Sequence, residues 1–342
     1  MNHHPPTRIV FVTGASRSGT TVLSRMLGNH SRIAGLRELH YFGDLCPADP
    51  AAPLDDREIE RLAAAIFARQ ARDYWGGGPA QPDRDRARQL RESLAPGERS
   101  GYGVFSAALA LLAADTGKNI ACEQTPRNIF YAPSILKHLP AASFVHIVRD
   151  PRAVLASQKN RWKIRTLGAR QVPLRDAIRT WANYHPLTMA RLWVSATNAA
   201  LRLVEDPRFK LVRFEDLLAT PDQCMREICE FIDVPFEPEM LEVPKWGSSN
   251  VKAESGSTGL SKDVLHQWEA VLGAGEIAIV EQMANGLMSH FSYEARTSAA
   301  LPGRRTLRHK LSYPLHLLGV ALTNPRRAVI QVRAMLGNNG HR

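Results

Sequence analysis

The sequence predicts an α/β fold in which a parallel sheet is flanked by helices. Short apolar runs of strand length alternate along the chain with segments of helical periodicity, an order that is typical of parallel sheets. The first run, residues 8–13, leads into a glycine- and serine-rich stretch and then into an apolar helical pattern. With 342 residues, 44% of them hydrophobic, the chain can bury the core of one large domain or of two small ones.

Four strands can be placed from these runs. Residues 8–13 indicate a fully buried parallel strand that feeds a helix over residues 20–28. Further strands are expected at residues 33–36, 143–148 and 210–214.

The helices between these strands carry recognisable start signals. Asp150 followed by Pro151 supplies an N-cap and a proline at the first helical position, which predicts a helix through about Arg161. The sequence T-P-D-Q at residues 220–223 has the form of a capping box and predicts another helix. Residues 44–115 are expected to form a helical insertion over the sheet.

The turn after the first strand has the spacing of a phosphate loop. Gly14 and Gly19 match the glycines of G-x-x-x-x-G-K-[ST], but Thr20 stands where the lysine is expected. Backbone N–H groups in such a turn point into one concavity, where the helix dipole also favours an anion. Arg17 offers a forked cation in place of the lysine. The residues expected to bind phosphate here are Ser16, Arg17, Ser18, Gly19, Thr20 and Thr21. A strand-to-helix turn that binds nothing is the alternative.

A second basic group follows the strand at residues 143–148. Arg149 ends that strand, and Ser157 and Arg161 are i, i+4 neighbours on the predicted helix after it. Because open sheets bind ligands at the carboxyl ends of their strands, the three side chains can converge on a second phosphate. Taken alone, Arg161 would be read as a solvated surface charge and Ser157 as a neutral helix residue.

Together these two segments resemble the nucleotide-binding signatures of sulfotransferases that use 3′-phosphoadenosine-5′-phosphosulfate (PAPS). The resemblance is to the bacterial branch related to tyrosylprotein sulfotransferases, and it covers residues 8 to about 294. The motifs that carry it, in chain order, are R-S-G-T-T (17–21), E-Q-T-P-R (123–127), V-R-D-P-R-A-V-L-A-S (148–157), R-F-E-D-L (213–217) and G-E-I-A-I-V-E-Q-M-A-N-G-L-M-S-H-F-S-Y-E (275–294).

The resemblance implies a division of labour among the basic residues. The 5′-phosphosulfate would lie in the loop from Ser16 to Thr21, and Arg149, Ser157 and Arg161 would hold the 3′-phosphate. The reaction would be an in-line transfer of a sulfuryl group to a hydroxyl of a small molecule, lipid, glycan or peptide. It would leave 3′-phosphoadenosine-5′-phosphate (PAP) as the product and need no metal ion.

The resemblance also places the general base at Glu38, 21 residues after Arg17. His40 is the alternative base, since other sulfotransferase branches use a histidine, and an ordinary surface ion pair is the alternative role for Glu38. Relatives commonly carry a lysine where this chain has Gln124, and that lysine stabilises the leaving group. In this chain either Arg17 alone would stabilise the leaving group, or the Arg127 side chain would extend to it as well.

Two other classes of protein fit the phosphate loop. One is a P-loop kinase of unusual type, although the loop lysine and a convincing acidic magnesium site are both missing. The other is a non-catalytic, membrane-associated nucleotide-binding protein. Gln124 favours this class, whereas Glu38 and Arg17 speak against it.

The charge of the chain is concentrated near its C-terminus. The net charge is +11, but residues 301–342 hold eight Lys or Arg and no Asp or Glu, so a nucleic-acid-binding surface over the whole protein is not expected. We therefore expect a sulfotransferase domain over residues 1–297 and a basic amphipathic tail over residues 298–342. The tail either packs on the domain as a helix or contacts the inner face of a membrane or an acidic partner.

Cysteine spacing and hydropathy indicate the cellular compartment in which the protein is expected. The four cysteines show no C-x-x-C spacing, so neither a disulfide framework nor a zinc site is expected, and a reduced cytoplasmic location fits best. Residues 1–7 are polar and the following apolar run is one strand long, so neither a signal peptide nor a membrane span of about 20 residues is predicted there.

Overall fold

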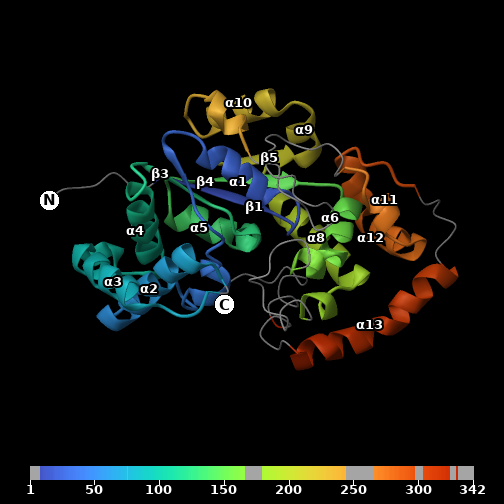
Figure 1. Cartoon of the computed structure of the whole chain (residues 1–342), viewed down its shortest axis with the longest axis horizontal. Coiled ribbons are helices and arrows are strands. Elements are labelled where there is room, and N and C mark those ends of the chain that lie inside the picture. Colours follow the sequence, from blue (N-terminus) through green and yellow to red (C-terminus); the bar gives the residue numbers. More distant parts are fainter. Residues whose placement is uncertain are drawn as a thin grey trace.

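The computed structural model describes residues 8–74, 76–165, 179–243, 265–296, 303–323 and 329. These residues form one sheet of five parallel strands in the order β2-β3-β1-β4-β5, which confirms the α/β prediction (Figure 1). The strands are β1 (Arg8–Gly14), β2 (Ile33–Gly35), β3 (Ile120–Glu123), β4 (Ala142–Val148) and β5 (Phe209–Arg213).

Helices connect the strands and extend beyond them. The α-helices are α1 (Thr20–Gly28), α2 (Asp56–Arg72), α3 (Gln81–Ser93), α4 (Gly101–Ala114), α5 (Ala132–His138), α6 (Pro151–Lys159), α8 (Pro186–Leu201), α9 (Phe214–Ala219), α10 (Pro221–Phe231), α11 (Trp268–Val271), α12 (Ala274–His290) and α13 (Gly303–Thr323). Short turns of 3₁₀ or π type are η1 (Tyr41–Leu45), η2 (Pro96–Glu98), η3 (Pro126–Tyr131), η4 (Arg161–Arg165) and η5 (Pro238–Leu241).

Both faces of the sheet are buried, as expected for parallel strands. Along β1, Ile9 and Phe11 face a core that is shared with α2, α3, α4, α5 and α8, and Phe11 stacks on Phe144 with ring centroids 4.8 Å apart. Val10 and Val12 face the opposite core, which is shared with α1, α9 and α10. Figure 1 shows these two helical layers on either side of the sheet. The sheet is therefore a rigid base for the loops at its edge.

Four of the strands match the sequence prediction, but β3 was not predicted. Its four residues, I-A-C-E, include two of low strand propensity and are too few to show a periodicity. Strand β3 forms because it pairs with both β2 and β1 and is fully buried between them. Tertiary packing therefore decides its conformation.

The two predicted helix starts had different outcomes. Asp150 caps α6 as predicted, since its carboxylate accepts a hydrogen bond from the Arg152 amide at 2.8 Å. The capping box at Thr220 is wrong, although α10 does begin at Pro221. The Thr220 hydroxyl instead donates to the carbonyl of Asp216 at 3.3 Å, because Thr220 also ends the preceding helix α9.

Residues 44–115 contain the helices α2, α3 and α4. Helix α2 opens with a capping box in which Asp55 and Glu58 each accept from the other's backbone amide. The insertion is joined to the main core, because Ile59 of α2, Leu90 of α3 and Phe105 of α4 belong to the same buried cluster as Phe11 of the sheet.

A buried ion network attaches α6 to α12. The Arg152 guanidinium binds Asp150 and also Glu281 of α12, with its Nη1 2.8 Å from the Glu281 carboxylate. It also lies 4.3 Å from the ring centroid of Trp268 on α11. These contacts keep the start of α6 fixed next to the end of β4.

No helix within these described ranges is long and apolar enough to cross a bilayer. All four cysteines are free thiols.

The buried His146 of β4 predicts an acid-dependent loss of stability. Burial lowers its pKa from 6.5 to about 3, so the folded protein keeps the ring neutral while the unfolded chain protonates it below pH 6.5. We expect the free energy of unfolding to fall as the pH drops from 6.5 towards 3, by up to about 1.4 kcal/mol per pH unit from this residue. Urea denaturation at a series of pH values measures the slope.

The variant His146→Gln isolates the contribution of this imidazole to the pH dependence of stability. Glutamine cannot titrate, but it can still hydrogen bond with the Thr13 hydroxyl, which lies 3.0 Å from His146 Nδ1. Its stability should depend less steeply on pH between about 6 and 4, by the equivalent of one proton. Equal slopes in the two proteins would contradict a neutral buried imidazole.

Candidate active site

The predicted site residues meet at the carboxyl edge of the sheet. A motif or a predicted site residue follows each of the five strands: the loop after β1, Glu38 after β2, Gln124 after β3, Arg149 after β4 and Phe214 after β5. The order of the strands puts β1 between β3 and β4, so the chain reverses its winding direction beside the phosphate loop. Ligands of open sheets bind at such a switch point.

The loop after β1 has the backbone of an anion-binding turn. Arg17 and Gly19 have positive φ angles of 81° and 107°. No side chain caps the N-terminus of α1, and its first turn holds no acidic residue. The amide groups at the start of the helix, where the positive end of the helix dipole lies, are thus available to bind an anionic ligand.

The other predicted loop residues line this turn. The Ser16 carbonyl accepts from Gln158 Nε2 at 3.1 Å, which ties the loop to α6. The Ser18 side chain is fully buried, and its hydroxyl has no hydrogen-bond partner among the described residues. Thr20 and Thr21 form the first turn of α1, where Thr20 is buried and Thr21 is half-buried.

Gly19 is required at its position by both backbone and packing. Its φ of 107° lies in the left-handed region, and a Cβ added there would meet Phe214 Cδ2 at 2.4 Å. Phe214 follows β5 and is itself buried. The aromatic ring thus closes one side of the loop.

Arg17 joins the two basic segments that the sequence placed apart. Its Nε donates to Ser157 Oγ at 3.0 Å, and its carbonyl accepts from Arg149 Nη1 at 3.2 Å. Burial, together with the charges of Arg161 and Arg149, lowers the pKa of Arg17 to about 10, and Glu38 only partly offsets this. The site therefore concentrates positive charge that an anion would neutralise.

The sequence predicts that Arg161 and Ser157 share a helix face, but in the structure they do not. Helix α6 ends at Lys159, and Arg161 begins the 3₁₀ turn η4. Asn160 caps α6 with a backbone conformation outside the helical region, so the i, i+4 spacing no longer applies. The charge of Arg161 acts on Arg17 and on Glu38, so this residue belongs to the same charged group.

Glu38 and His40, the two proposed bases, contact each other. Glu38 Oε2 lies 3.1 Å from His40 Nε2, and both side chains are partly exposed. Burial alone would raise the pKa of Glu38, but the hydrogen bond with His40 and the charges of His40, Arg161 and Arg17 hold it below its ordinary value of 4.5. Glu38 is therefore ionised at neutral pH.

Two residues of the motif E-Q-T-P-R, to which the sequence alone assigned no role, hold this segment in place. The buried carboxylate of Glu123, at the end of β3, accepts from the Leu39 amide at 3.1 Å. The Thr125 hydroxyl accepts from the His40 amide at 3.0 Å and donates to Glu123. His40 has a φ of 47°, an uncommon conformation for a residue with a side chain. These hydrogen bonds form a clamp in which Glu123 and Thr125 hold the backbone of residues 39–40.

Gln124 stands where a lysine was expected, and Arg127 does not take the place of that lysine. The Arg127 guanidinium hydrogen bonds with Tyr131, and a Cβ at Gly43 would lie 3.0 Å from its Nη2, so it points towards η1 and η3. Gln124 is half-buried, and its Oε1 accepts no hydrogen bond from the described part of the chain. Arg17 thus remains the cation of the loop.

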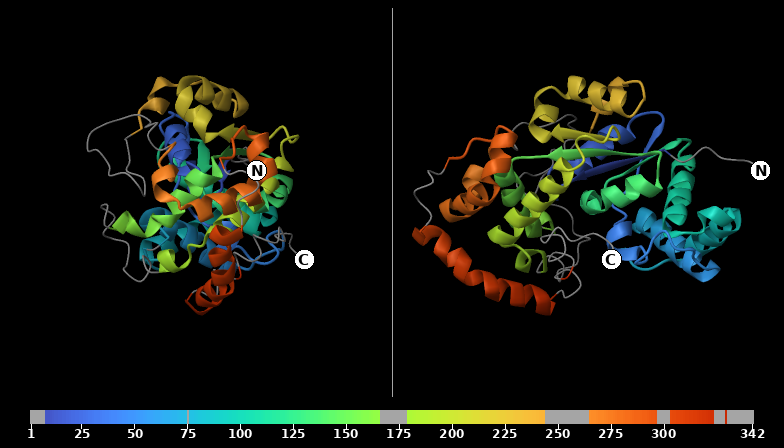
Figure 2. Two further views of the ribbon diagram at one scale, coloured as in Figure 1. Left: turned by 90° about the vertical axis from the view of Figure 1, so that its right-hand side faces the viewer. Right: turned by 180° about the vertical axis from the view of Figure 1, so that it is seen from behind.

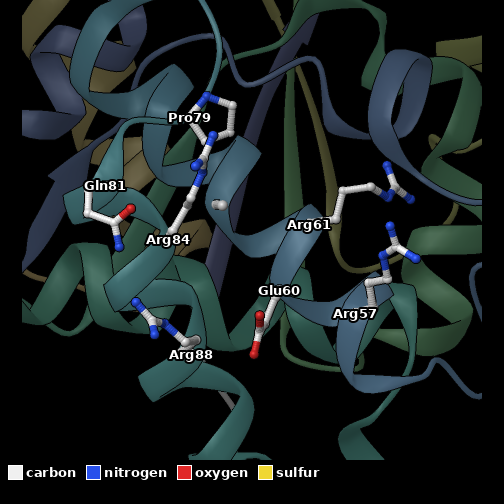
Figure 3. Close-up of a pocket in the computed structure, with 8 residues that line it drawn as sticks. Arg57, Glu60, Arg61, Pro79, Gln81, Arg84 and Arg88 are labelled. Atoms are coloured by element: carbon white, nitrogen blue, oxygen red, sulfur yellow. The ribbon is translucent and has the colours of Figure 1, made fainter.

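A separate hollow lies between α2 and α3 (Figure 3) and has a volume of about 480 Å³. It is lined by Arg57, Glu60, Arg61, Ala64, Pro79, Gln81, Arg84 and Arg88. None of the predicted site residues lines it. Over the ranges that the structure describes, no three His, Cys, Asp or Glu side chains come together as a metal site.

The comparison with known families identifies the class of protein. A model described as the sulfotransferase family matches residues 9–238, which is more than half of the chain, so the chain belongs to the sulfotransferase family. The resemblance seen in the sequence is confirmed. Enzymes of this class transfer sulfuryl groups.

Individual relatives are distant. The chain is 26% identical over 224 residues to carbohydrate sulfotransferase 3 of Tetronarce californica, covering 60% of this chain and 48% of that protein. It is 23% identical over 235 residues to the protein-tyrosine sulfotransferase of Drosophila melanogaster, covering 68% of this chain and 39% of that one. The chain thus spans less than half the length of either relative.

A solved structure shares the fold. The sulfotransferase domain of the olefin synthase from Synechococcus PCC 7002 superposes with a TM-score of 0.51 at 21% identity, covering 86% of this chain and 98% of that domain.

Substitution of Gly19 tests the geometry of the loop. Gly19→Ala forces a Cβ against Phe214 and places alanine at a positive φ, so we expect the free energy of unfolding to fall by about 1–3 kcal/mol. Chemical denaturation provides the measurement. The control is Gly286→Ala on α12, where nothing lies within 4 Å of the added Cβ. That change should be neutral or stabilising, by up to about 1 kcal/mol.

A double variant separates the two causes. In Gly19→Ala/Phe214→Ala the clash is gone while the strained backbone angle stays, so the two destabilisations should combine to less than their sum. Strict additivity would mean that the ring of Phe214 does not restrict Gly19.

Proposed function

We propose that the protein is a PAPS-dependent sulfotransferase that transfers a sulfuryl group to a hydroxyl of a small-molecule, lipid, glycan or peptide acceptor. The observation that carries the proposal is the contact between the two basic segments, in which Arg17 binds Ser157 and its carbonyl binds Arg149. This contact joins an uncapped helix N-terminus to the second set of groups that we propose bind phosphate.

The residues present fit a nucleotide that carries two separate anionic groups. The 5′-phosphosulfate would lie at the α1 N-terminus against residues 16–21, and the 3′-phosphate would be held by Arg149 and Ser157. Arg161 lies close enough to Glu38 to lower its pKa, so we place it on the side of the site where the acceptor would enter. When bound, PAPS supplies the sulfuryl group.

The protein groups then have distinct tasks. Glu38 would accept the proton of the acceptor hydroxyl, whose oxygen would bond to sulfur as the bond from sulfur to the phosphate oxygen breaks. His40 holds the Glu38 carboxylate in place. Arg17 neutralises the charge that develops on the departing phosphate. The sulfuryl group carries less negative charge than a phosphoryl group, so arginine can serve where kinases use lysine and magnesium.

The 3′-phosphate should dominate recognition of the nucleotide. Isothermal titration calorimetry should give an affinity for PAP about 10- to 100-fold higher than for AMP, since charge-assisted hydrogen bonds contribute about 1.5–3 kcal/mol. Ser157→Ala should weaken PAP binding more than AMP binding. The control Ser93→Ala, on the distant helix α3, should change neither. Equal affinities for PAP and AMP would contradict the proposal, and tighter binding of ATP with magnesium would favour a kinase.

Removal of the Glu38 carboxylate should separate binding from turnover. Glu38→Gln should keep its affinity for PAP while kcat falls by about 10²- to 10⁴-fold, because the base is lost and the shape of the site is kept. Transfer of label from ³⁵S-PAPS to an acceptor measures this. Glu92→Gln, an exposed residue of α3, serves as the control.

The pH profile identifies which group of the pair is the base. Since the pKa of Glu38 lies below 4.5, kcat/KM should stay level from neutral pH down to about 4.5 as long as the protein remains folded. An acid limb at about pH 6–7, where an ordinary imidazole titrates, would instead assign the base to His40. Full activity of Glu38→Gln would exclude Glu38 in either case.

A further inference from the structure

Helix α13 packs on the protein through rings and small side chains, not through leucines. It contacts α8 and α12. Its buried and half-buried residues share one face and include Thr306, His309, Tyr313, His316 and Val320. The ring of His185, the N-cap residue of α8, lies 4.8 Å from that of His316 and 5.0 Å from that of Tyr313. Burial, together with the nearby His316 and His309, lowers the pKa of His185 to about 4, so this ring is neutral at neutral pH.

The opposite face of α13 exposes a row of leucines. We call this row the leucine strip; it comprises Leu307, Leu311, Leu315, Leu318 and Leu322, whose side chains are 48%, 69%, 73%, 58% and 76% exposed. Successive helical residues are about 100° apart, so the strip is about 80° wide, runs for about 22 Å and lies nearly opposite the packed face. Figures 1 and 2 show α13 along the outside of the molecule, with α8 and α12 on one side only.

This arrangement is the reverse of a normal surface helix, which turns its leucines inward. Scattered exposed leucines need no explanation, but a continuous apolar strip marks an interaction surface. The inner face makes the contacts with α8 and α12, including a hydrogen bond of 3.1 Å from Arg191 to the Tyr313 hydroxyl, and neither that bond nor the ring contacts with His185 involve a leucine of the strip. The strip is therefore available to an external partner.

The charges beside the strip are all positive. The helix carries Arg304, Arg305, Arg308 and Lys310 and no acidic residue, and none occurs anywhere in residues 301–342. Arg308 and Lys310 are exposed. Counted around the helix at about 100° per residue, they lie about 60° and 100° from the centre of the strip, one on each side.

We propose that α13 lies on the surface of a bilayer that contains anionic lipids, with the leucine strip inserted among the acyl chains. The basic side chains at its borders would reach the lipid phosphates. A leucine face flanked by cations is the pattern of helices that lie in the interface plane. This inference does not depend on the proposed transferase activity.

The same features speak against other occupants. A second copy of the chain would bring the same positive charge to the strip, with no carboxylate on this helix to pair with it. A protein partner would need a groove of its own that fits a convex row of five leucines. A bilayer surface is planar, apolar at the right depth and negatively charged, and it therefore matches both the strip and its borders.

Flotation of the full-length protein with vesicles tests the proposal. Vesicles of phosphatidylcholine are compared with vesicles that contain about 30% phosphatidylglycerol. Wild-type protein should bind the anionic vesicles, and the triple variant Leu311→Ser/Leu315→Ser/Leu318→Ser should lower the partition coefficient at least tenfold. Arg308→Gln/Lys310→Gln should lower it about tenfold on anionic vesicles only, as should 0.5 M salt for the wild type.

Matched controls keep the result specific. Leu111→Ser/Val204→Ser removes exposed apolar side chains elsewhere and should bind vesicles like the wild type. Because the strip leucines are exposed, the triple variant should unfold at the wild-type temperature. The proposal is overturned if wild-type protein does not float with anionic vesicles, if the triple variant floats equally well, or if sedimentation shows that the strip serves a dimer in place of lipid.

Discussion

The concentration of positive charge at the carboxyl edge of the sheet is the constraint on which the rest of the site depends. Arg149 is buried and Arg17 is half-buried beside it, and desolvation together with the charges of Arg161 and Arg149 lowers the pKa of Arg17 to about 10. Holding such charges together costs free energy unless carboxylates or a ligand anion neutralise them. Glu38 and, near Arg149, Glu215 and Asp150 do so in part. A bound polyanion would complete the neutralisation, so the same repulsion favours binding.

Networks of hydrogen bonds hold these charged side chains in place. The Glu215 carboxylate accepts from the Asp150 amide at 3.0 Å and from the Tyr293 hydroxyl at 2.7 Å, which links the ends of β4 and β5 to the segment after α12. On the other side of the phosphate loop, Glu123 fixes the segment that holds Glu38. Such fully bonded groups fix orientation more than they add stability. The arginines can therefore lie close together in a site whose geometry is fixed.

Several elements were predictable because their signals are local. The strand, loop and helix at residues 8–28 follow from apolar runs and glycine spacing, and Asp150 caps α6 as its position before a proline indicates. Strand β3 had no such signal, and the end of α6 had only a weak one. Four residues cannot show a period, and Lys159 followed by Asn160 is a weaker stop signal than a glycine or a proline. The clamp formed by Glu123 and Thr125 stayed hidden for the same reason, since the hydrogen bonds with the Leu39 and His40 amides cross some 85 residues of chain.

The sequence by itself determined the alternation of strands and helices, the phosphate loop without its lysine, and the motifs by which the chain belongs to the sulfotransferase family. The tertiary structure alone decided that Arg17 contacts Ser157 across 140 residues, that Arg161 lies beyond its helix, and that the leucines of α13 face outward. The physical reason is the lateral order of the sheet. Local patterns fix where a strand begins and ends, but only packing places β1 between β3 and β4 and so brings their loops together.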